Sequence, residues 1–279
     1  MNKPDKPLIY FFLIAFALAW AFMAWPIARN SGLLSEELPF EMLLIFGSWM
    51  PNIAAFIVLG WIIKRKGAIK ELLKGWLRWN MHPGWYLLAF SPVLFGFITI
   101  FIFRWLYGYS PSTELFADPA AFIGLLVLIT ITGAMGEELG WRGFALPRLQ
   151  LRMNALSASI LLGIIWAFWH LPLWFAGLGF ESIPYWAYLL IGVSFSIMVT
   201  AACNSSCGSM LIATLFHLFL NVSVNMIDNE AFPVLAAIFV IASIVTVAIL
   251  GPEKLSRVSI LPLDKEKKTW NSKLSKEKA

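Results

Sequence analysis

Blocks of about twenty apolar residues recur along the whole chain, and this feature limits its possible folds more than any other. A helix of about 20 apolar residues spans the roughly 30 Å hydrocarbon core of a bilayer. Lipid offers the backbone no hydrogen-bond partners, so each spanning block must be helical. The blocks are residues 8–28, 40–63, 84–107, 119–139, 155–176, 184–203, 208–227 and 231–251. We therefore expect an all-α polytopic membrane helical bundle of about eight transmembrane helices, and the low charged fraction of 13% agrees with this class.

Lysine and arginine are distributed unevenly among the segments that connect these blocks. With the N-terminus inside, 19 of the 21 Lys and Arg residues fall in inner segments. Because positive charge is retained on the inner side of a membrane, we expect both termini to be cytoplasmic and the protein to be integral to the cell membrane. The net charge of +5 then reflects topology and contact with anionic lipid, and it does not indicate nucleic-acid binding.

Two segments outside the apolar blocks have a clear character of their own. Residues 64–79, KRKGAIKELLKGWLRW, place apolar side chains on one helical face and basic side chains on the other. This pattern predicts an interfacial amphipathic helix on the cytoplasmic leaflet. Residues 252–279 carry eight Lys and Arg residues against four acidic ones. The chain is thus expected to comprise a transmembrane domain, residues 1–251, and a basic cytoplasmic tail, residues 252–279.

A few polar and ionisable residues interrupt the apolar blocks in the second half of the chain. An ionisable side chain at membrane depth is expensive, so each one marks a candidate functional site. They occur in three stretches on different predicted helices, MGEELGWR, WAFWH and HLFLN. The candidate residues are Glu137, Glu138, Arg142, His170, His217 and Asn221, with Asn225 one turn further along.

The positions of these residues along the chain predict a common depth. Asn154 is a suitable N-cap, so the turn just before it should join two antiparallel helices. Glu137 and His170 are nearly equidistant from that turn, each roughly 25 Å away at 1.5 Å per residue. The helix that carries Glu137 must then continue beyond the bilayer to about Leu151. His217 reaches the same depth if the short turn before its helix is sunk in the membrane.

Helical spacing also predicts which of these side chains share a face. Glu138 and Arg142 are four residues apart, which favours an ion pair on a face turned away from Glu137. His217 and Asn221 are likewise four residues apart and share one face. Four glycines fall on one flank of Glu137 and would permit the close approach of another helix or of an extended peptide. They are Gly133, Gly136, Gly140 and Gly143.

The candidate residues suit hydrolysis by an activated water. A buried carboxylate beside a histidine, here Glu137 and His170, can hold and deprotonate a water molecule. A histidine and an amide, here His217 and Asn221, can donate two hydrogen bonds to a developing oxyanion. Alternatively, Glu137, His170 and His217 could bind Zn²⁺ with an open fourth position. The residues themselves leave both possibilities open.

In this order on successive helices, the three motifs resemble those of the CPBP intramembrane proteases, which include the CAAX prenyl endopeptidases and bacteriocin-immunity proteins. EELGWR fits an EExxxR motif, WAFWH fits an aromatic-xxx-H motif and HLFLN fits an HxxxN motif. The resemblance covers about residues 120–225, within a protease-like core at 119–227. It departs from the family only at Trp166, where phenylalanine is common. It implies the roles given above for the water-binding and oxyanion pairs, with Glu138 and Arg142 supporting the site.

The resemblance implies an intramembrane endopeptidase that cuts a membrane-tethered peptide or protein near the cytoplasmic side. It is compatible with a metalloprotease, with Zn²⁺ as cofactor, and with a metal-free glutamate mechanism. A proton or metal transporter with a Glu137–His170–His217 relay is one alternative, although a relay needs polar residues at several depths. A non-catalytic bacteriocin-immunity or scaffold protein is another, although binding alone does not need a buried base.

Overall fold

The computed structural model describes residues 5–35, 46–110 and 117–257, and these residues form helices joined by short turns. The α-helices are α1 (Lys6–Asn30), α3 (Met50–Ile57), α4 (Ala68–Leu73), α5 (Gly84–Tyr107), α6 (Pro119–Ile129), α7 (Met135–Glu138), α8 (Leu146–Gln150), α9 (Ala155–Trp169), α10 (Tyr185–Ser205), α11 (Met210–Asn225) and α12 (Phe232–Leu250). The π-helical turns are η1 (Val58–Ile62), η3 (Thr130–Ala134) and η4 (Leu139–Ala145). The 3₁₀ turns are η2 (Lys74–Leu77), η5 (Leu171–Phe175), η6 (Phe180–Ser182) and η7 (Asn229–Ala231).

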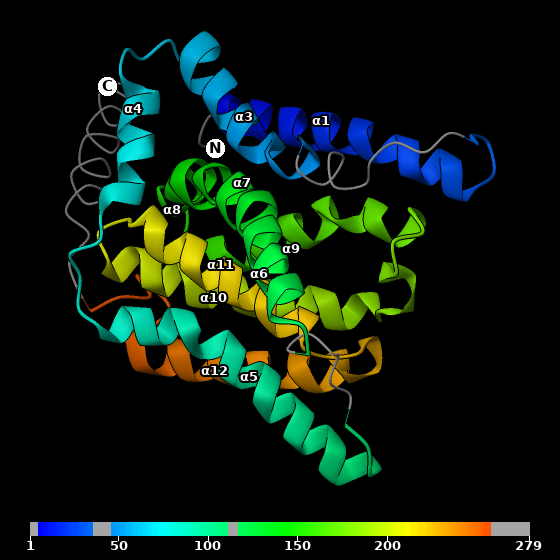
Figure 1. Ribbon diagram of the computed structural model, residues 1–279. Coiled ribbons are helices and arrows are strands. Elements are labelled where there is room, and N and C mark those ends of the chain that lie inside the picture. The colour runs from blue at the N-terminus through cyan, green and yellow to red at the C-terminus, as the bar shows by residue number, and fades with distance from the viewer. Residues whose placement is uncertain (1–4, 36–45, 111–116, 258–279) are drawn as a thin grey trace.

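Helix α10 forms the centre of the bundle (Figure 1). It packs against α9 and α12, while α11 packs against α5 and α10. Within the apolar part of α10, 72% of the residues are buried, against 22% to 44% in the other long helices. Helices α1 and α3 pack on each other, and α3 also contacts α7 and η4. The polar motifs on α7, α9 and α11 therefore lie in the interior of the bundle.

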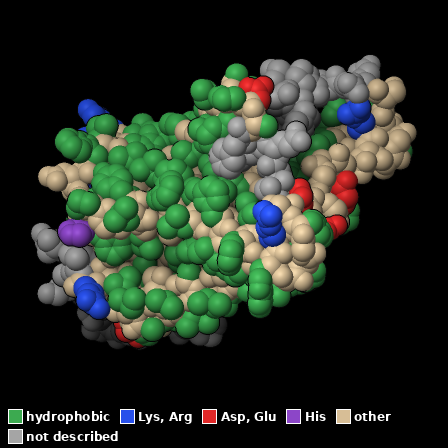
Figure 2. Space-filling model, turned by 60° about the horizontal axis from the view of Figure 1, so that its bottom comes forward, with side chains coloured by type: hydrophobic (Ala, Val, Ile, Leu, Met, Phe, Trp, Pro, Cys, Tyr) green, Lys and Arg blue, Asp and Glu red, His purple; other side chains and the backbone are tan. Residues whose placement is uncertain are grey.

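Large apolar side chains cover the outside of this bundle, and Figure 2 shows a face on which they greatly outnumber charged ones. Leu13, Phe101, Trp105, Ile123 and Ile244 are each between 61% and 78% exposed. An apolar surface of this extent is typical of contact with lipid. In the described part of the chain, six helices are long and apolar enough to cross a membrane. The prediction of a polytopic helical membrane bundle is confirmed.

One predicted span is shorter than the sequence suggested, and another is described only in part. Met50–Ile62 and Met210–Asn225 are apolar helical segments below the length of the other six. Residues 40–45, where the second span was predicted to begin, lie outside the described residues. Most of the predicted tail, from residue 258 onward, also lies outside them.

Residues 119–150 form one continuous helical run, as expected for a helix that extends to about Leu151. The following turn ends at Asn154, whose side chain accepts a hydrogen bond from the backbone N–H of Ser157. Within the run, π turns η3 and η4 lie on either side of α7. A π turn contains more residues than an α turn, so it rotates the faces that follow it, and such turns are frequent at functional sites.

The four glycines of this run consequently face different neighbours. A Cβ built on Gly136 would lie 3.0 Å from the carbonyl oxygen of Ser48, and one on Gly140 would lie 2.5 Å from that of Pro51. These two glycines allow the segment at the start of α3 to approach closely. Gly133 instead faces α11, and Gly143 faces side chains of α4 and α11. The prediction of a single glycine flank is therefore only partly right, because the π turns change the register.

The predicted amphipathic helix at 64–79 is shorter than expected and packs partly on protein. It consists of α4 followed by the 3₁₀ turn η2. Gly75 is buried, and a Cβ at this position would lie 2.5 Å from Met210. Trp76 donates a hydrogen bond from Nε1 to Thr214 Oγ1 at 3.1 Å. Part of its apolar face thus contacts α11, which the amphipathic pattern alone did not reveal.

Candidate active site

A cavity of about 170 Å³ lies inside the bundle, between η3, α7, α11 and the end of α9. Four of the residues singled out from the sequence line it: Glu137, His170, His217 and Asn221. They come from three separate helical segments, and Glu137 and His217 are each only 2% exposed. The cavity is therefore a mainly apolar pocket that four polar residues also line.

Two indoles fix the carboxylate of Glu137. Trp141 Nε1 and Trp166 Nε1 both donate to Glu137 Oε2, at 3.1 Å and 2.7 Å. Oε1 lies 3.9 Å from His170 Nε2. The carboxylate is thus held through one oxygen, while the other faces the histidine across a gap.

The backbone fixes the orientation of His170. Its Nδ1 lies 2.8 Å from the carbonyl oxygen of Trp166. A carbonyl oxygen can only accept, so we assign the proton of a neutral ring to Nδ1. Nε2 is then an acceptor directed at Glu137. A water between Nε2 and the carboxylate could donate one hydrogen bond to each of them.

A buried chain of charged groups holds His217. Its Nδ1 lies 2.7 Å from Glu138 Oε1, and Arg142 Nη1 donates to the same oxygen at 2.9 Å. The side chains of Glu138 and Arg142 are both 0% exposed. Because that oxygen already accepts from an arginine, Nδ1 of His217 is the donor in the second contact. The Glu138–Arg142 pair therefore has a direct link to His217, which sequence spacing did not predict.

Gly133 leaves the space into which His217 and Asn221 reach. A Cβ built on Gly133 would lie 3.4 Å from His217 Nε2 and 2.6 Å from Asn221 Nδ2. Both nitrogens thus lie beside the same point on η3. Asn225 instead donates to the backbone carbonyl of Asn221 at 2.8 Å and is exposed.

The sequence did not predict that the indoles of Trp141 and Trp166 bind Glu137. It also did not predict that Gly133 leaves space for His217 and Asn221. Trp141 follows Glu137 by four residues and Trp166 precedes His170 by four, so helical spacing placed both near the motifs. In an apolar helix, however, a tryptophan is usually part of the packing, and only the tertiary structure reveals its acceptor. Tyr188 also lines the cavity, with its ring centroid 5.7 Å from that of His170.

The zinc ligand set considered from the sequence consists of Glu137, His170 and His217. No group of three or more His, Cys, Asp or Glu side chains in the described part of the chain is placed to hold a metal ion. A histidine that binds a metal through one ring nitrogen commonly donates from the other to a carboxylate, and Nδ1 of His217 makes such a contact with Glu138. Glu137 Oε2 already accepts two indole hydrogen bonds.

Comparison with known proteins gives matches over this same region. Residues 119–223 match the sequence profile of a family described as type II CAAX prenyl endopeptidase Rce1-like. CAAX prenyl protease 2 of Methanococcus maripaludis is 27% identical over 201 residues, which cover 64% of this chain and 71% of that protein. The profile match spans the glutamate pair and both histidine motifs. Over this core the chain is therefore similar to the CAAX-protease-like proteins, in agreement with the CPBP family that its three motifs resemble.

Proposed function

We propose that this protein is an intramembrane endopeptidase that cuts a membrane-tethered peptide or protein by a glutamate-activated water. The observation that carries the proposal is the 3.9 Å gap between Glu137 Oε1 and His170 Nε2. This gap opens on a cavity that His217 and Asn221 also line. A general base and two oxyanion donors in one pocket are the functions that peptide-bond hydrolysis by water requires.

In the proposed reaction, Glu137 and His170 hold the water by accepting its two hydrogen bonds. The water oxygen attacks the peptide carbonyl carbon as Glu137 Oε1 takes one of its protons. The carbonyl oxygen becomes an oxyanion and accepts from His217 Nε2 and Asn221 Nδ2. The carbon–nitrogen bond then breaks, and Glu137 returns the proton to the leaving amine. The products are a carboxylic acid and an amine, so no further reactant is needed.

Donation by His217 Nε2 requires a ring that carries protons on both nitrogens, because Nδ1 already donates to Glu138. His217 is then an imidazolium next to a carboxylate. Its charge and that of Arg142 balance the charges of Glu137 and Glu138. Buried charges need such compensation, since an unpaired one is strongly destabilising. This balance of charges among the four buried side chains therefore supports an oxyanion site in which His217 is a cationic donor.

The function can be tested by comparing the membrane proteomes of cells that carry the wild type or Glu137→Gln. We expect one or more membrane-attached proteins to lose a C-terminal fragment only with the wild type. If the two proteomes contain the same fragments, the protein does not cut under those conditions and the endopeptidase proposal is wrong for that cell.

Replacing Gly133 by Ala should reduce cleavage by about 10²–10³-fold, the usual effect of losing one oxyanion donor. The reason is that a Cβ at Gly133 would displace Asn221, whose Nδ2 lies 2.6 Å from that position. The rate is measured on a substrate found by the proteomic comparison. Gly124→Ala is the matched control, because nothing lies within 4 Å of a Cβ built there on the same helical run. Equal cleavage rates for the two variants would show that Asn221 does not bind the oxyanion.

We also propose that both ends of the chain face the cytoplasm, from the distribution of Lys and Arg. In a Cys207→Ser background, a cysteine at exposed Asp228 should react with a membrane-impermeant maleimide in intact cells. A cysteine at exposed Lys66, at the other end of the bundle, should react only after permeabilisation. The reverse pattern would invert the proposed topology.

A further inference from the structure

Asn52 is a polar residue in the apolar segment Met50–Ile62, and the mechanism proposed above does not use it. Its side chain is 0% exposed and lies in the first turn of α3. A buried amide inside an apolar bundle is costly unless its donor and its acceptor are both satisfied. The partners of Asn52 therefore indicate what this residue does.

Both partners of the Asn52 amide are backbone groups of the helical run that carries the two glutamates. Asn52 Nδ2 donates to the carbonyl oxygen of Met135 at 2.7 Å, and Oδ1 accepts from the backbone N–H of Gly140 at 2.9 Å. The amide thus satisfies one acceptor and one donor on a neighbouring segment. Glu137 and Glu138 lie between these two residues in the chain.

The two backbone groups are five residues apart, which is the spacing of a π-helical hydrogen bond. In a regular α-helix the N–H of Gly140 would donate to the carbonyl of Gly136, four residues earlier. Here Asn52 accepts from it, and the run changes from α7 to the π turn η4 at Leu139. Lipid cannot satisfy a backbone group that leaves the α-helical pattern, so a neighbouring side chain must do so. The side chain of Asn52 is therefore inserted into the hydrogen-bond pattern at this change of register.

Two glycines allow α3 to approach closely enough for the short side chain of an asparagine. A Cβ on Gly136 would lie 3.0 Å from the carbonyl oxygen of Ser48, and one on Gly140 would lie 2.5 Å from that of Pro51. The two glycines stand on either side of the glutamate pair in the chain. The close backbone contact and the two hydrogen bonds of Asn52 therefore fix the same short stretch, residues 135–140.

The groups that orient both carboxylates follow directly after this stretch. Trp141 donates to Glu137 Oε2, and Arg142 donates to Glu138 Oε1. A shift of Gly140 relative to α7 would move both donors, because they follow it in the same turn. The orientation of each carboxylate thus depends on the register that the buried amide holds.

We propose that Asn52 is a positioning residue of the candidate active site, which holds the turn of the two glutamates in the register that directs Glu137 Oε1 at His170. An amide suits this function because one planar group carries a donor and an acceptor side by side. A carboxylate has no donor for the carbonyl of Met135, and leucine, which has nearly the same shape, has neither group. The effect on catalysis rests on the proposed endopeptidase function, whereas the effect on the orientation of Glu137 does not.

The test compares the purified wild type with Asn52→Leu, which keeps the approximate shape of the side chain and removes both hydrogen bonds. We expect kcat for a substrate found in the proteomic comparison to fall by about 10²-fold, the effect of misplacing a reacting group by about 1 Å. KM should not change, because no contact with the substrate is removed. The unfolding midpoint in detergent reports whether the variant is folded.

A second readout does not depend on catalysis. In an NMR spectrum of protein labelled at the indole nitrogens, the resonance of Trp141 Nε1–H reports the hydrogen bond to Glu137 and is assigned by its absence in Trp141→Phe. In Asn52→Leu it should move toward the position of an indole without a charged acceptor. The resonance of Trp174, which donates to the carbonyl of Ile183, should stay in place.

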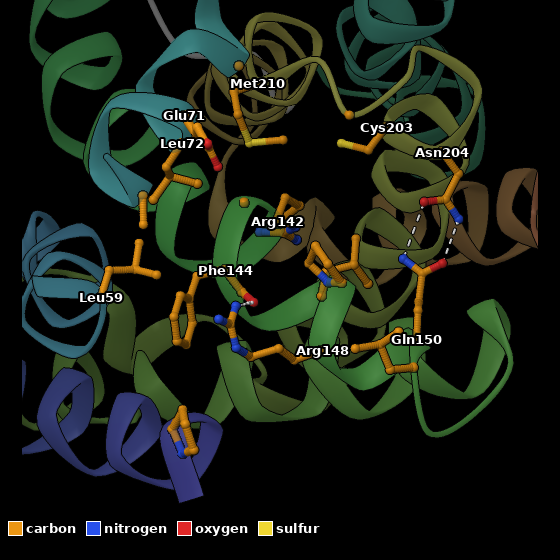
Figure 3. A pocket seen from close by; sticks show the side chains of 18 of the residues that line it. Leu59, Glu71, Leu72, Arg142, Phe144, Arg148, Gln150, Cys203, Asn204 and Met210 are labelled. Atoms are coloured by element: carbon orange, nitrogen blue, oxygen red, sulfur yellow. Dashed lines mark hydrogen bonds between the residues drawn. The ribbon is translucent and has the colours of Figure 1, made fainter. Parts of the chain in front are cut away.

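Asn204→Leu is the matched control, because it removes another buried amide that has side-chain and backbone partners. Figure 3 shows the two hydrogen bonds that join Asn204 to Gln150, on the wall of a second cavity of about 530 Å³. Asn204 also donates to the carbonyl of Lys254, and neither partner belongs to the candidate active site. Both kcat and the Trp141 resonance should be as in the wild type.

The proposal is wrong if folded Asn52→Leu has an unchanged Trp141 resonance or an unchanged kcat. Asn52→Ser, whose hydroxyl is too short to bridge both backbone groups, takes the place of Asn52→Leu if that variant does not fold. If neither variant folds while Asn204→Leu does, Asn52 supports the fold as a whole and is not a positioning residue. If the wild type cuts nothing, the proposed function fails, and the Trp141 resonance still decides whether Asn52 orients Glu137.

Discussion

Replacing Glu137 by Gln should lower the rate of substrate cleavage by about 10²–10⁴-fold, the usual contribution of a general base. Glutamine has nearly the same shape, and its amide oxygen can still accept the hydrogen bonds of Trp141 and Trp166. Its NH₂ group would then face His170 Nε2 and donate to it, in the position that the water occupies in the proposed reaction. The variant therefore loses the base and the water position together, while the packing around the carboxylate is retained.

The measurement is the cleavage rate of purified wild type and variant on a substrate found in the proteomic comparison. The unfolding midpoint in detergent reports whether the variant is folded. Glu181→Gln, the same substitution at an exposed position in η6, is the matched control and should leave the rate unchanged. A folded Glu137→Gln protein that cuts at the wild-type rate would show that the base lies elsewhere.

The all-α membrane bundle could be predicted from the sequence because lipid imposes a simple length rule on apolar helices. The hydropathy pattern does not, however, fix the register within a helix. The run from Pro119 to Gln150 is as long as the sequence predicts, but its two π turns do not follow from the sequence pattern. They separate Gly133, which faces α11, from Gly140, which faces α3. Small local changes of this kind depend on which neighbours pack against the helix.

The candidate site residues could be selected from the sequence because ionisable groups are rare at membrane depth. Their partners on other helices could not be selected in the same way. Pairing of Glu138 with Arg142 follows from their spacing on one helix, whereas the contact of Glu138 with His217 joins residues 79 positions apart. Likewise, Trp166 has the appearance of an apolar packing residue until its hydrogen bond to Glu137 is seen.

Arg142→Ala should reduce the free energy of unfolding by about 3–5 kcal/mol, the usual cost of breaking a buried ion pair from one side. Glu138 and Arg142 are fully buried, so the variant leaves a buried carboxylate that still contacts His217 but has lost its arginine. The measurement is the unfolding transition in detergent. Arg65→Ala is the matched control, because it breaks the exposed Arg65–Glu71 pair. That change should cost less than about 1 kcal/mol.

Replacing Glu138 and Arg142 together by leucine should then restore stability without restoring cleavage. An apolar pair of suitable volume removes both buried charges, which is often neutral for stability or better. Nδ1 of His217 would, however, lose its acceptor, and an imidazolium at this position would lose its counter-charge. If the double variant recovers both stability and activity, His217 does not need Glu138. The proposal that His217 is a cationic oxyanion donor is then wrong. If instead Arg142→Ala is as stable as the wild type but inactive, Arg142 acts directly on the substrate and does not serve mainly to hold Glu138.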